Sequence, residues 1–271
     1  MSLSRPAGRV QSRISESVAA DIRQRILRGT YPAGPLPKQD DLIDEYGVSG
    51  PSLREALRIL EAEGLITVRR GKFGGAFIHP PSWSSAAYAL GLSMQGQGVR
   101  VHDLAAAIHD LEPRCAESCA TREDRRETVV PALEANIADS EKVVGDGAHF
   151  TAVSRTFHDI FVDFAENQTL RLVVRSLVAV WTIQEQAWAV AMEGEGHYPS
   201  AEQQLAVLEA HRAITHLVAR GDRNKVGRIA AEHLAATQPR VLQFCGDRIV
   251  DASSEAAVRG FRGLGSPLRS E

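Results

Sequence analysis

A short segment, His79-Pro80-Pro81-Ser82, divides the chain into two parts with different hydrophobic patterns. Two adjacent prolines lack the amide protons that a helix or a central strand needs, so regular structure is expected to end there. Before this segment, apolar residues recur with both helical and strand periods, whereas from Trp83 onward only the helical period is present. We therefore predict a mainly α protein with a mixed domain over residues 11–79 and an antiparallel all-helical bundle over residues 83–245.

Glycine-containing breaks separate the expected helices of the second part, and the connections are short enough for antiparallel neighbours. The candidate helices cover about 83–95, 101–121, 123–144, 147–165, 168–192, 200–220 and 222–244. The last residues, 246–271, are rich in Gly, Ser and Arg, and we predict a flexible tail there.

Charge is distributed unevenly between the two parts. The whole chain carries 31 Lys and Arg against 34 Asp and Glu, a net charge of -3, which by itself argues against binding to nucleic acid. Residues 1–80 carry 12 basic and 9 acidic residues, a net of +3, and the rest of the chain carries -6. A basic module joined to an acidic one indicates one anion-binding end, so a DNA-binding surface is expected in the N-terminal part.

The N-terminal part has the element order of a winged helix-turn-helix. Four apolar residues at spacing four predict one face of a first helix: Ile14, Val18, Ile22 and Ile26. A short helix over about 38–46 ends at the tight turn Gly47-Val48-Ser49, after which Ser49 can cap a third helix. Two β-prone segments, 65–69 and 76–78, follow with a basic, glycine-rich loop between them. In this arrangement the helix after the turn enters the major groove of DNA.

Candidate DNA contacts are expected on the third helix and on the wing. Ser52, Arg54 and Arg58 are predicted on the side of the third helix opposite its apolar stripe. Clustered cations bind phosphates, and the backbone N–H groups of a glycine loop can approach phosphate closely. Arg54 is the leading candidate for reading a base, because a guanidinium pairs with guanine O6 and N7. Its alternative role is an ion pair with Glu55 or Glu61. The full set of candidates is Ser49, Ser52, Arg54, Arg58, Arg69, Arg70, Lys72 and Gly74.

Residues 36–78 resemble the winged-helix domain of GntR-family bacterial transcription regulators. The matching motifs are Leu36-Pro37, Tyr46-Gly47-Val48-Ser49, Leu53-Arg54-Glu55-Ala56-Leu57, Glu63-Gly64-Leu65-Ile66 and the Arg-Arg-Gly of the wing. The resemblance implies a homodimer on an inverted-repeat operator, with half-sites spaced to match the dimer axis. Asp40 and Gly50 depart from the family pattern, in which arginine is frequent at both positions. Two DNA contacts of the family are therefore expected to be missing.

The helical part is similar to the ligand-sensing FCD-type domain of the FadR branch of that family, a bundle of six or seven helices. The similarity rests on Thr156-Phe157-His158-Asp159-Ile160 with Asn167, and on Glu209-Ala210-His211 with Asp222, Ala230 and His233. It implies a ligand-binding site with three histidines in the bundle, and an effector that is a small carboxylate or an acyl-type metabolite.

The positions of the histidines are consistent with a metal site. His211 and His233 lie on consecutive helices joined at Gly221-Asp222, so an antiparallel hairpin places both at the same height. With His158, three imidazoles that converge in a bundle can hold one divalent metal such as Zn²⁺ or Ni²⁺. Ser154 stands where many metal-binding members carry an aspartate, which removes one charged ligand. Three outcomes stay open: metal held by three histidines with water or an effector carboxylate, weaker binding, or no metal.

The candidates for effector binding are Ser154, Arg114, Arg171, Arg175 and Trp181. An arginine can pair with a carboxylate effector, although a surface ion pair is the more common role. Trp181 is expected to form core or pocket wall.

These features predict a ligand-responsive, sequence-specific DNA-binding regulator, specifically a repressor released by its effector. The alternative is a three-histidine metal-dependent hydrolase with an accessory domain, but its general base in an H-E-x-x-H motif is missing, so no enzyme is expected. No apolar run approaches the roughly 18 residues of a membrane span, and the first residues lack a signal-peptide core. Three cysteines are too few for a disulfide framework. A cytoplasmic protein without a membrane partner is expected.

Overall fold

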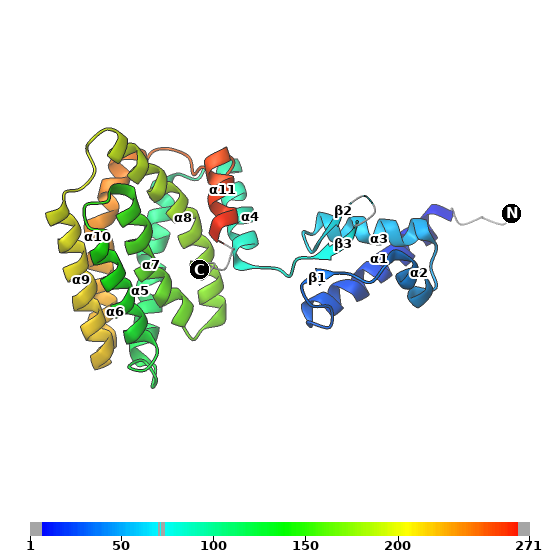
Figure 1. Cartoon of the computed structure of the whole chain (residues 1–271), viewed down its shortest axis with the longest axis horizontal. Helices are drawn as coiled ribbons and strands as arrows, with labels where there is room; N and C mark the ends of the chain where they lie inside the picture. The colour runs from blue at the N-terminus through cyan, green and yellow to red at the C-terminus, as the bar shows by residue number, and fades with distance from the viewer. Residues whose placement is uncertain (1–6, 70, 72–73, 265–271) are drawn as a thin grey trace. The chain divides into compact units, whose positions relative to one another are not determined.

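The computed structural model describes residues 7–69, 71 and 74–264, and the chain forms two compact units, residues 1–82 and 83–271 (Figure 1). Helices dominate, with one small antiparallel sheet in the N-terminal unit, which confirms the predicted mainly α fold. The elements of the N-terminal unit are α1 (Ala7–Leu27), β1 (Gly34–Pro35), α2 (Gln39–Tyr46), α3 (Gly50–Ala62), β2 (Ile66–Arg69) and β3 (Gly75–Ile78).

The turn between α2 and α3 follows from local chemistry. Gly47 ends α2 in the left-handed conformation, with φ of 60°, which a residue without Cβ adopts at little cost. Ser49 then caps α3 by accepting a hydrogen bond from the backbone N–H of Ser52, and Pro51 occupies the first turn, where its missing N–H costs nothing. These residues set where α3 begins.

The sheet order is β1-β3-β2, with Ile66 of β2 opposite Ile78 of the central strand β3. The two-residue strand β1 was not expected from the sequence, because Gly34 and Pro35 carry no strand pattern. The side chains of Ile22, Leu53 and Leu60 are fully buried where α1 packs across α3, and Ile66 and Ile78 close the same core from the sheet. The wing is thereby held against the helix that precedes it.

The C-terminal unit is all-helical over its described residues. Its elements are α4 (Trp83–Gly96), α5 (Val101–Thr121), α6 (Val129–Lys142), α7 (Gly147–Phe164), α8 (Gln168–Gly194), α9 (Ala201–Arg220), α10 (Arg223–Cys245) and α11 (Glu255–Leu264). Helix α6 begins later than the predicted residue 123, because Arg122 pairs with Asp124 and the backbone N–H groups of Glu127 and Thr128 bond to the Asp124 carbonyl. These contacts hold residues 123–128 as turns.

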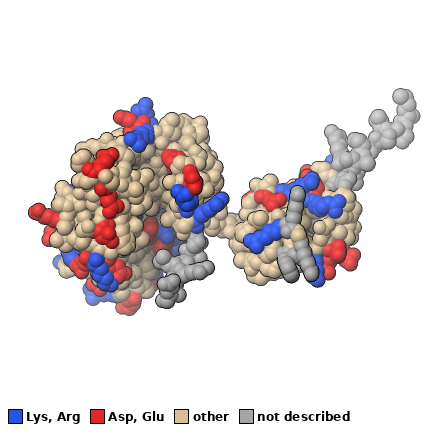
Figure 2. Space-filling model, turned by 45° about the horizontal axis from the view of Figure 1, so that its top comes forward, with Lys and Arg blue, Asp and Glu red and all other residues tan. Residues whose placement is uncertain are grey.

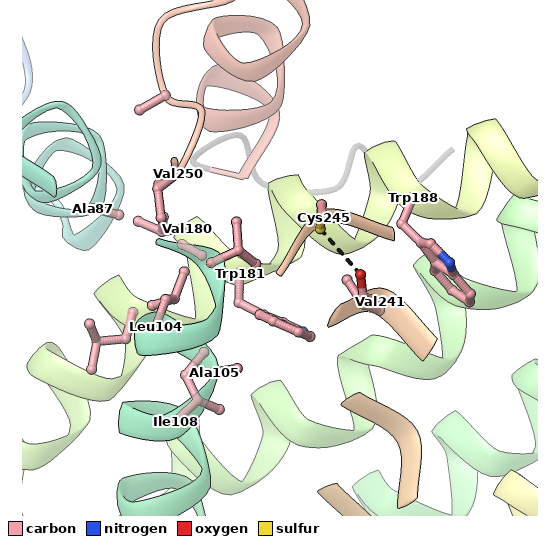
Figure 3. Packing of buried hydrophobic residues seen from close by; sticks show 14 of the residues in the cluster. Ala87, Leu104, Ala105, Ile108, Val180, Trp181, Trp188, Val241, Cys245 and Val250 are labelled. Atoms are coloured by element: carbon pink, nitrogen blue, oxygen red, sulfur yellow. Dashed lines mark hydrogen bonds between the residues drawn. The ribbon is translucent and has the colours of Figure 1, made fainter. Parts of the chain in front are cut away.

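Helices α5, α8 and α10 surround one large apolar core. Figure 3 shows the indole of Trp181, on α8, lying between Ala105 and Ile108 of α5 and Val241 of α10. Trp181 is 1% exposed, so almost its whole ring is removed from water. This packing fixes the faces of α8 and α10 that border the cavity described below.

The predicted flexible tail over 246–271 is wrong for its described residues. Val250, Ala252 and Phe261 are buried, and α11 packs against α4 and α8. A Cβ added at Gly91 of α4 would lie 2.9 Å from the Ala252 Cβ, so the two segments are in close contact. The glycine and serine content of this stretch concealed these buried residues and Ala257, which is buried as well. Residues 265–271 lie outside the described residues.

Candidate functional site

Three buried histidines from three helices converge inside the C-terminal unit. His158 lies on α7, His211 on α9 and His233 on α10, and one nitrogen from each lies within 4.8 Å of the other two. The Nε2 atoms of His211 and His233 are 3.2 Å apart. The structure therefore brings together the three residues that the sequence singled out as metal ligands.

Glu112 of α5 fixes the orientation of His158. Its Oε1 lies 2.5 Å from the Nδ1 of His158, and its Oε2 accepts a hydrogen bond of 2.9 Å from Arg155. Since Nδ1 is held by the carboxylate, Nε2 is the nitrogen of His158 that remains for a ligand. A carboxylate behind a histidine is the usual arrangement around protein-bound metals, where it sets the tautomer and raises the basicity of the ring.

The surroundings keep two of the imidazoles neutral. Burial lowers the pKa of His233 to about 3, with a further lowering from His158. Burial also places the pKa of His211 well below its ordinary value, reinforced by the neighbouring His233 and His158. Phe157 stacks on the ring of His211 with centroids 3.8 Å apart, which keeps water from that side. A neutral imidazole has the free lone pair that metal coordination requires.

The spacing of these nitrogens fits a divalent transition metal. Two imidazole nitrogens bound to one tetrahedral Zn²⁺ at the usual bond length lie about 3.3 Å apart. The observed separation of 3.2 Å between His211 and His233 matches that value. The Nδ1 of His211 is buried without a hydrogen-bond partner among the described residues, so on that side the ring is held by packing. The three histidines thus form a cluster that can hold a metal ion.

A cavity of about 80 Å³ adjoins the histidines. Ser154 and Trp181, both predicted for effector binding, line it, and so do the aromatic rings of Trp188 and Tyr198. Ser154 occupies the helical turn before His158 and is buried, so its hydroxyl stands where an aspartate would add a ligand. The position brings no charge to the site.

The three arginines predicted for effector binding do not line this cavity. Arg114 pairs with Glu117 on the surface, and Arg171 donates to the backbone carbonyl of Asp163. Arg175 pairs with both Asp159 and Asp163 and lies over the ring of Trp83, in a separate hollow. All three therefore lie outside the cavity beside the histidines: Arg114 is on α5, which contributes no cavity residue, and Arg171 and Arg175 are engaged by Asp159 and Asp163.

Sequence reasoning missed the charged residues that do line the cavity or support it. Arg155 lies at the cavity wall, with Glu185 of α8 facing it and Glu112 behind it. Arg155 stands three residues before His158, a spacing that places both on one side of α7 and was a usable signal. No local sequence pattern predicts Glu112 or Glu185, since they lie on α5 and α8 and not on the helices that carry the histidines.

The predicted DNA-contacting residues of α3 divide into exposed and buried ones. Arg54 and Arg58 are exposed, as expected, but Ser52 is 3% exposed and its hydroxyl lies 2.9 Å from that of Ser49. The prediction that Ser52 faces outward is wrong, because its hydroxyl and its backbone N–H both bond to the Ser49 hydroxyl at the start of α3. Ser49 itself is exposed.

Arg54 has no ion-pair partner among the described residues. Glu55 pairs with Arg58 at 3.3 Å, and Glu61 accepts a hydrogen bond from the backbone N–H of Val68. A Cβ at Gly50 would lie 3.3 Å from the Nη1 of Arg54, so the glycine leaves room for that guanidinium. The alternative role of Arg54 in an ion pair is therefore not realised.

On the wing, Arg69 and Gly74 are exposed, and the guanidinium of Arg69 lies 4.4 Å from the centre of the Phe77 ring. Arg70 and Lys72 lie outside the described residues. Figure 2 shows several Lys and Arg side chains on the visible face of the N-terminal unit, and a row of Asp and Glu on the C-terminal unit.

Two family profiles match the chain, one for each unit. The profile described as "Bacterial regulatory proteins, gntR family" matches residues 14–78, and the profile "FCD domain" matches residues 103–236. The chain belongs to the GntR family of bacterial regulatory proteins.

Similar proteins agree with this membership in the GntR family. The HTH-type transcriptional regulator Rv0494 of Mycobacterium tuberculosis is 28% identical over 88% of this chain and 93% of its own length. The HTH-type transcriptional repressor NanR of Cronobacter sakazakii is 26% identical over 77% and 79%. Among solved structures, a GntR protein of Streptococcus agalactiae has a TM-score of 0.63 at 22% identity and covers 83% of this chain and 99% of its own. The last likeness supports the fold.

As a GntR-family member with an FCD domain, the chain is a DNA-binding transcription regulator with a domain for a small-molecule effector. Its partners are operator DNA and that effector, and regulators of this family are typically dimers. The comparisons give no support to the alternative of a metal-dependent hydrolase. No helix in the described part of the chain combines the length and apolar composition needed to cross a membrane.

Proposed function

We propose that this regulator is a homodimeric repressor that leaves an inverted-repeat operator when a small carboxylate binds at the three histidines. The observation that carries the proposal is the buried cluster of His158, His211 and His233 beside a cavity that contains Arg155. A ligand bound in such a site, which four helices enclose, can stabilise one arrangement of these helices over another. Differential affinity for two arrangements is all that ligand control requires.

A divalent metal, Zn²⁺ or Ni²⁺, completes the proposed site. The Nε2 atoms of the three histidines would hold it, and Glu112 would keep His158 in position. The metal supplies a positive charge that attracts a carboxylate oxygen. Glu112 is already bound to both His158 and Arg155, so it is placed to orient these groups rather than to move protons. We therefore assign the site to sensing and not to catalysis.

In the N-terminal unit, Arg54 and Arg58 on α3 are the proposed contacts in the major groove. Ser49, Arg69 and Gly74 are the proposed contacts to the DNA backbone. The exposure of these residues supports the assignment, and the freedom of Arg54 from ion pairs supports its role in base reading. The DNA partner implies that the protein acts in the cytoplasm.

A gel-shift assay with DNA from the promoter region of its own gene tests the proposal. We expect the full-length protein to retard this fragment at low salt, and we expect elemental analysis to give one metal per chain. Absence of any shift would remove the DNA-binding role. If the purified protein contains no metal and its melting temperature does not change on addition of Zn²⁺ or Ni²⁺, the proposed metal site is contradicted.

A further inference from the structure

The cavity contains a donor and an acceptor that lack hydrogen-bond partners among the described residues. The Nε of Arg155 and the Oε2 of Glu185 are both buried and unpartnered, and they lie 3.9 Å apart. That separation is too long for a hydrogen bond between them. Buried polar atoms without partners cost free energy, so a pair of them facing one cavity indicates a group that belongs between them.

Neither side chain can easily turn away to find another partner. The Nη2 of Arg155 is bound by Glu112, which is itself fixed by His158, so the guanidinium is held in place from behind. Glu185 lies on α8, one turn beyond the fully buried Trp181, and lines the cavity; its carboxylate accepts a hydrogen bond from the Trp181 side chain, which holds it in place. Burial raises the pKa of Glu185, while the charge of Arg155 acts in the opposite direction. The two polar groups are thus held in position to bind a ligand.

The chemistry of these two atoms restricts what can bind between them. The Nε of Arg155 can only donate a hydrogen bond, and a carboxylate oxygen of Glu185 can only accept one. An ammonium group has no acceptor for Arg155, and a carboxylate or ketone oxygen has no proton for Glu185. A hydroxyl satisfies both, because it accepts with a lone pair and donates its proton.

We propose that Arg155 and Glu185 form a hydroxyl-binding subsite, so that the cavity selects a small hydroxy-substituted carboxylate over the same acid without its hydroxyl. This inference rests on the proposed function, which places the carboxylate at the histidines. Glu112 connects the two ends, since it contacts both Arg155 and His158. The three histidines, Arg155 and Glu185 line the same cavity, so one small molecule in it adjoins both the histidines and the subsite.

The size of the cavity agrees with a ligand of this kind. Its volume of about 80 Å³ is smaller than the roughly 150 Å³ of an engineered protein cavity that holds benzene. The apolar wall comes from Trp181 and Trp188, whereas the hydroxyls of Tyr198 and Thr151 already bond to each other at 2.6 Å. Ser154 and Arg240 also line the cavity, but apart from the Nδ1 of His211, the Nε of Arg155 and the Oε2 of Glu185 are its fully buried polar atoms without a hydrogen-bond partner among the described residues.

The test compares matched acids on the full-length protein loaded with Zn²⁺. Binding of lactate is measured against propionate, and 3-hydroxybutyrate against butyrate, by isothermal titration calorimetry at pH 7.5. We expect at least one hydroxy acid to bind tenfold or more tightly than its partner, because hydrogen bonds to charged groups discriminate by at least that factor. In Glu185→Met, which keeps the length of the side chain without an acceptor, the ratio should fall below about twofold. Glu195→Met, at an exposed position just beyond α8, is the control.

Three results would overturn the subsite. They are equal affinities within both pairs, no binding of any of the four acids, or a hydroxyl preference that survives in Glu185→Met. The zinc content and melting temperature of each variant establish that it is folded and loaded. A gel shift on the same preparations separates this inference from the proposed function. If the protein binds DNA and zinc but shows no preference for the hydroxy acids, only the subsite is contradicted. If the unchanged protein does not bind DNA, the proposed repressor function is contradicted.

Discussion

The Nδ1 of His158 lies 2.5 Å from the Oε1 of Glu112, although the two residues come from different helices. This contact decides which nitrogen of the ring faces the other two histidines. The same carboxylate pairs with Arg155 at 2.9 Å, so the metal-binding end and the arginine end of the cavity share one anchor. A change at Glu112 is therefore expected to affect both ends.

Glu112→Gln should weaken zinc binding about 10- to 100-fold, because a residue that orients a ligand contributes that much to metal affinity. It should also lower the free energy of unfolding by about 3 kcal/mol, since Arg155 is left buried beside a neutral amide. Chelator competition gives the affinity and urea unfolding gives the stability. Glu134→Gln, on the exposed face of α6, is the control and should change neither. A zinc affinity in Glu112→Gln equal to that of the unchanged protein would mean that the carboxylate has no role in holding His158.

Zinc should raise the melting temperature by about 5 to 10 °C when present at 100 times its dissociation constant. Such an excess stabilises the folded chain by about 2.7 kcal/mol, and each kcal/mol shifts a unit of this size by about 2 to 4 °C. In His233→Gln the rise should disappear, because the cluster loses one of its three imidazoles. Scanning fluorimetry with EDTA or Zn²⁺ measures both. His216→Gln, exposed on α9, should respond to zinc as the unchanged chain does; a full response in His233→Gln would show that the metal binds elsewhere.

Arg54→Ala should reduce operator affinity about tenfold or more without changing stability. A bidentate contact to a base contributes about 1 to 3 kcal/mol, and the side chain is exposed and makes no ion pair among the described residues. Fluorescence anisotropy with operator DNA at two salt concentrations measures the loss. Arg259→Ala, an exposed arginine on α11, is the matched control. If both variants bind DNA equally well, Arg54 is not part of the interface.

Phe261→Ala should lower the free energy of unfolding by about 3 kcal/mol, the usual cost of removing a buried aromatic ring. Phe261 is 4% exposed and packs edge-on against Tyr88 of α4, with ring centroids 5.4 Å apart. Urea unfolding measures the change, and Arg262→Ala on the same helix should stay within about 0.5 kcal/mol of the unchanged protein. A flexible C-terminal segment would instead make the two variants indistinguishable.

Much of the secondary structure could be predicted because it depends on neighbours in the chain. Helical spacing of apolar residues located α5, α7 and α9 to within a residue or two, and Gly47 with Ser49 located the turn before α3. The similar distances of His211 and His233 from the Gly221-Asp222 turn, 10 and 11 residues, indicated that they meet. Each of these patterns is set by the geometry of one helix or of two joined helices.

The sequence by itself therefore determined the two kinds of unit, the helices and the three histidines. Only the tertiary structure decided that Glu112 reaches His158, that Arg155 rather than Arg175 lines the cavity, and that Phe261 is buried. The physical reason is that helical periodicity predicts which face of each helix is apolar, but not which other segment that face packs against. That choice depends on packing between segments far apart in the chain, as Glu112 and His158 are, and no local pattern records it.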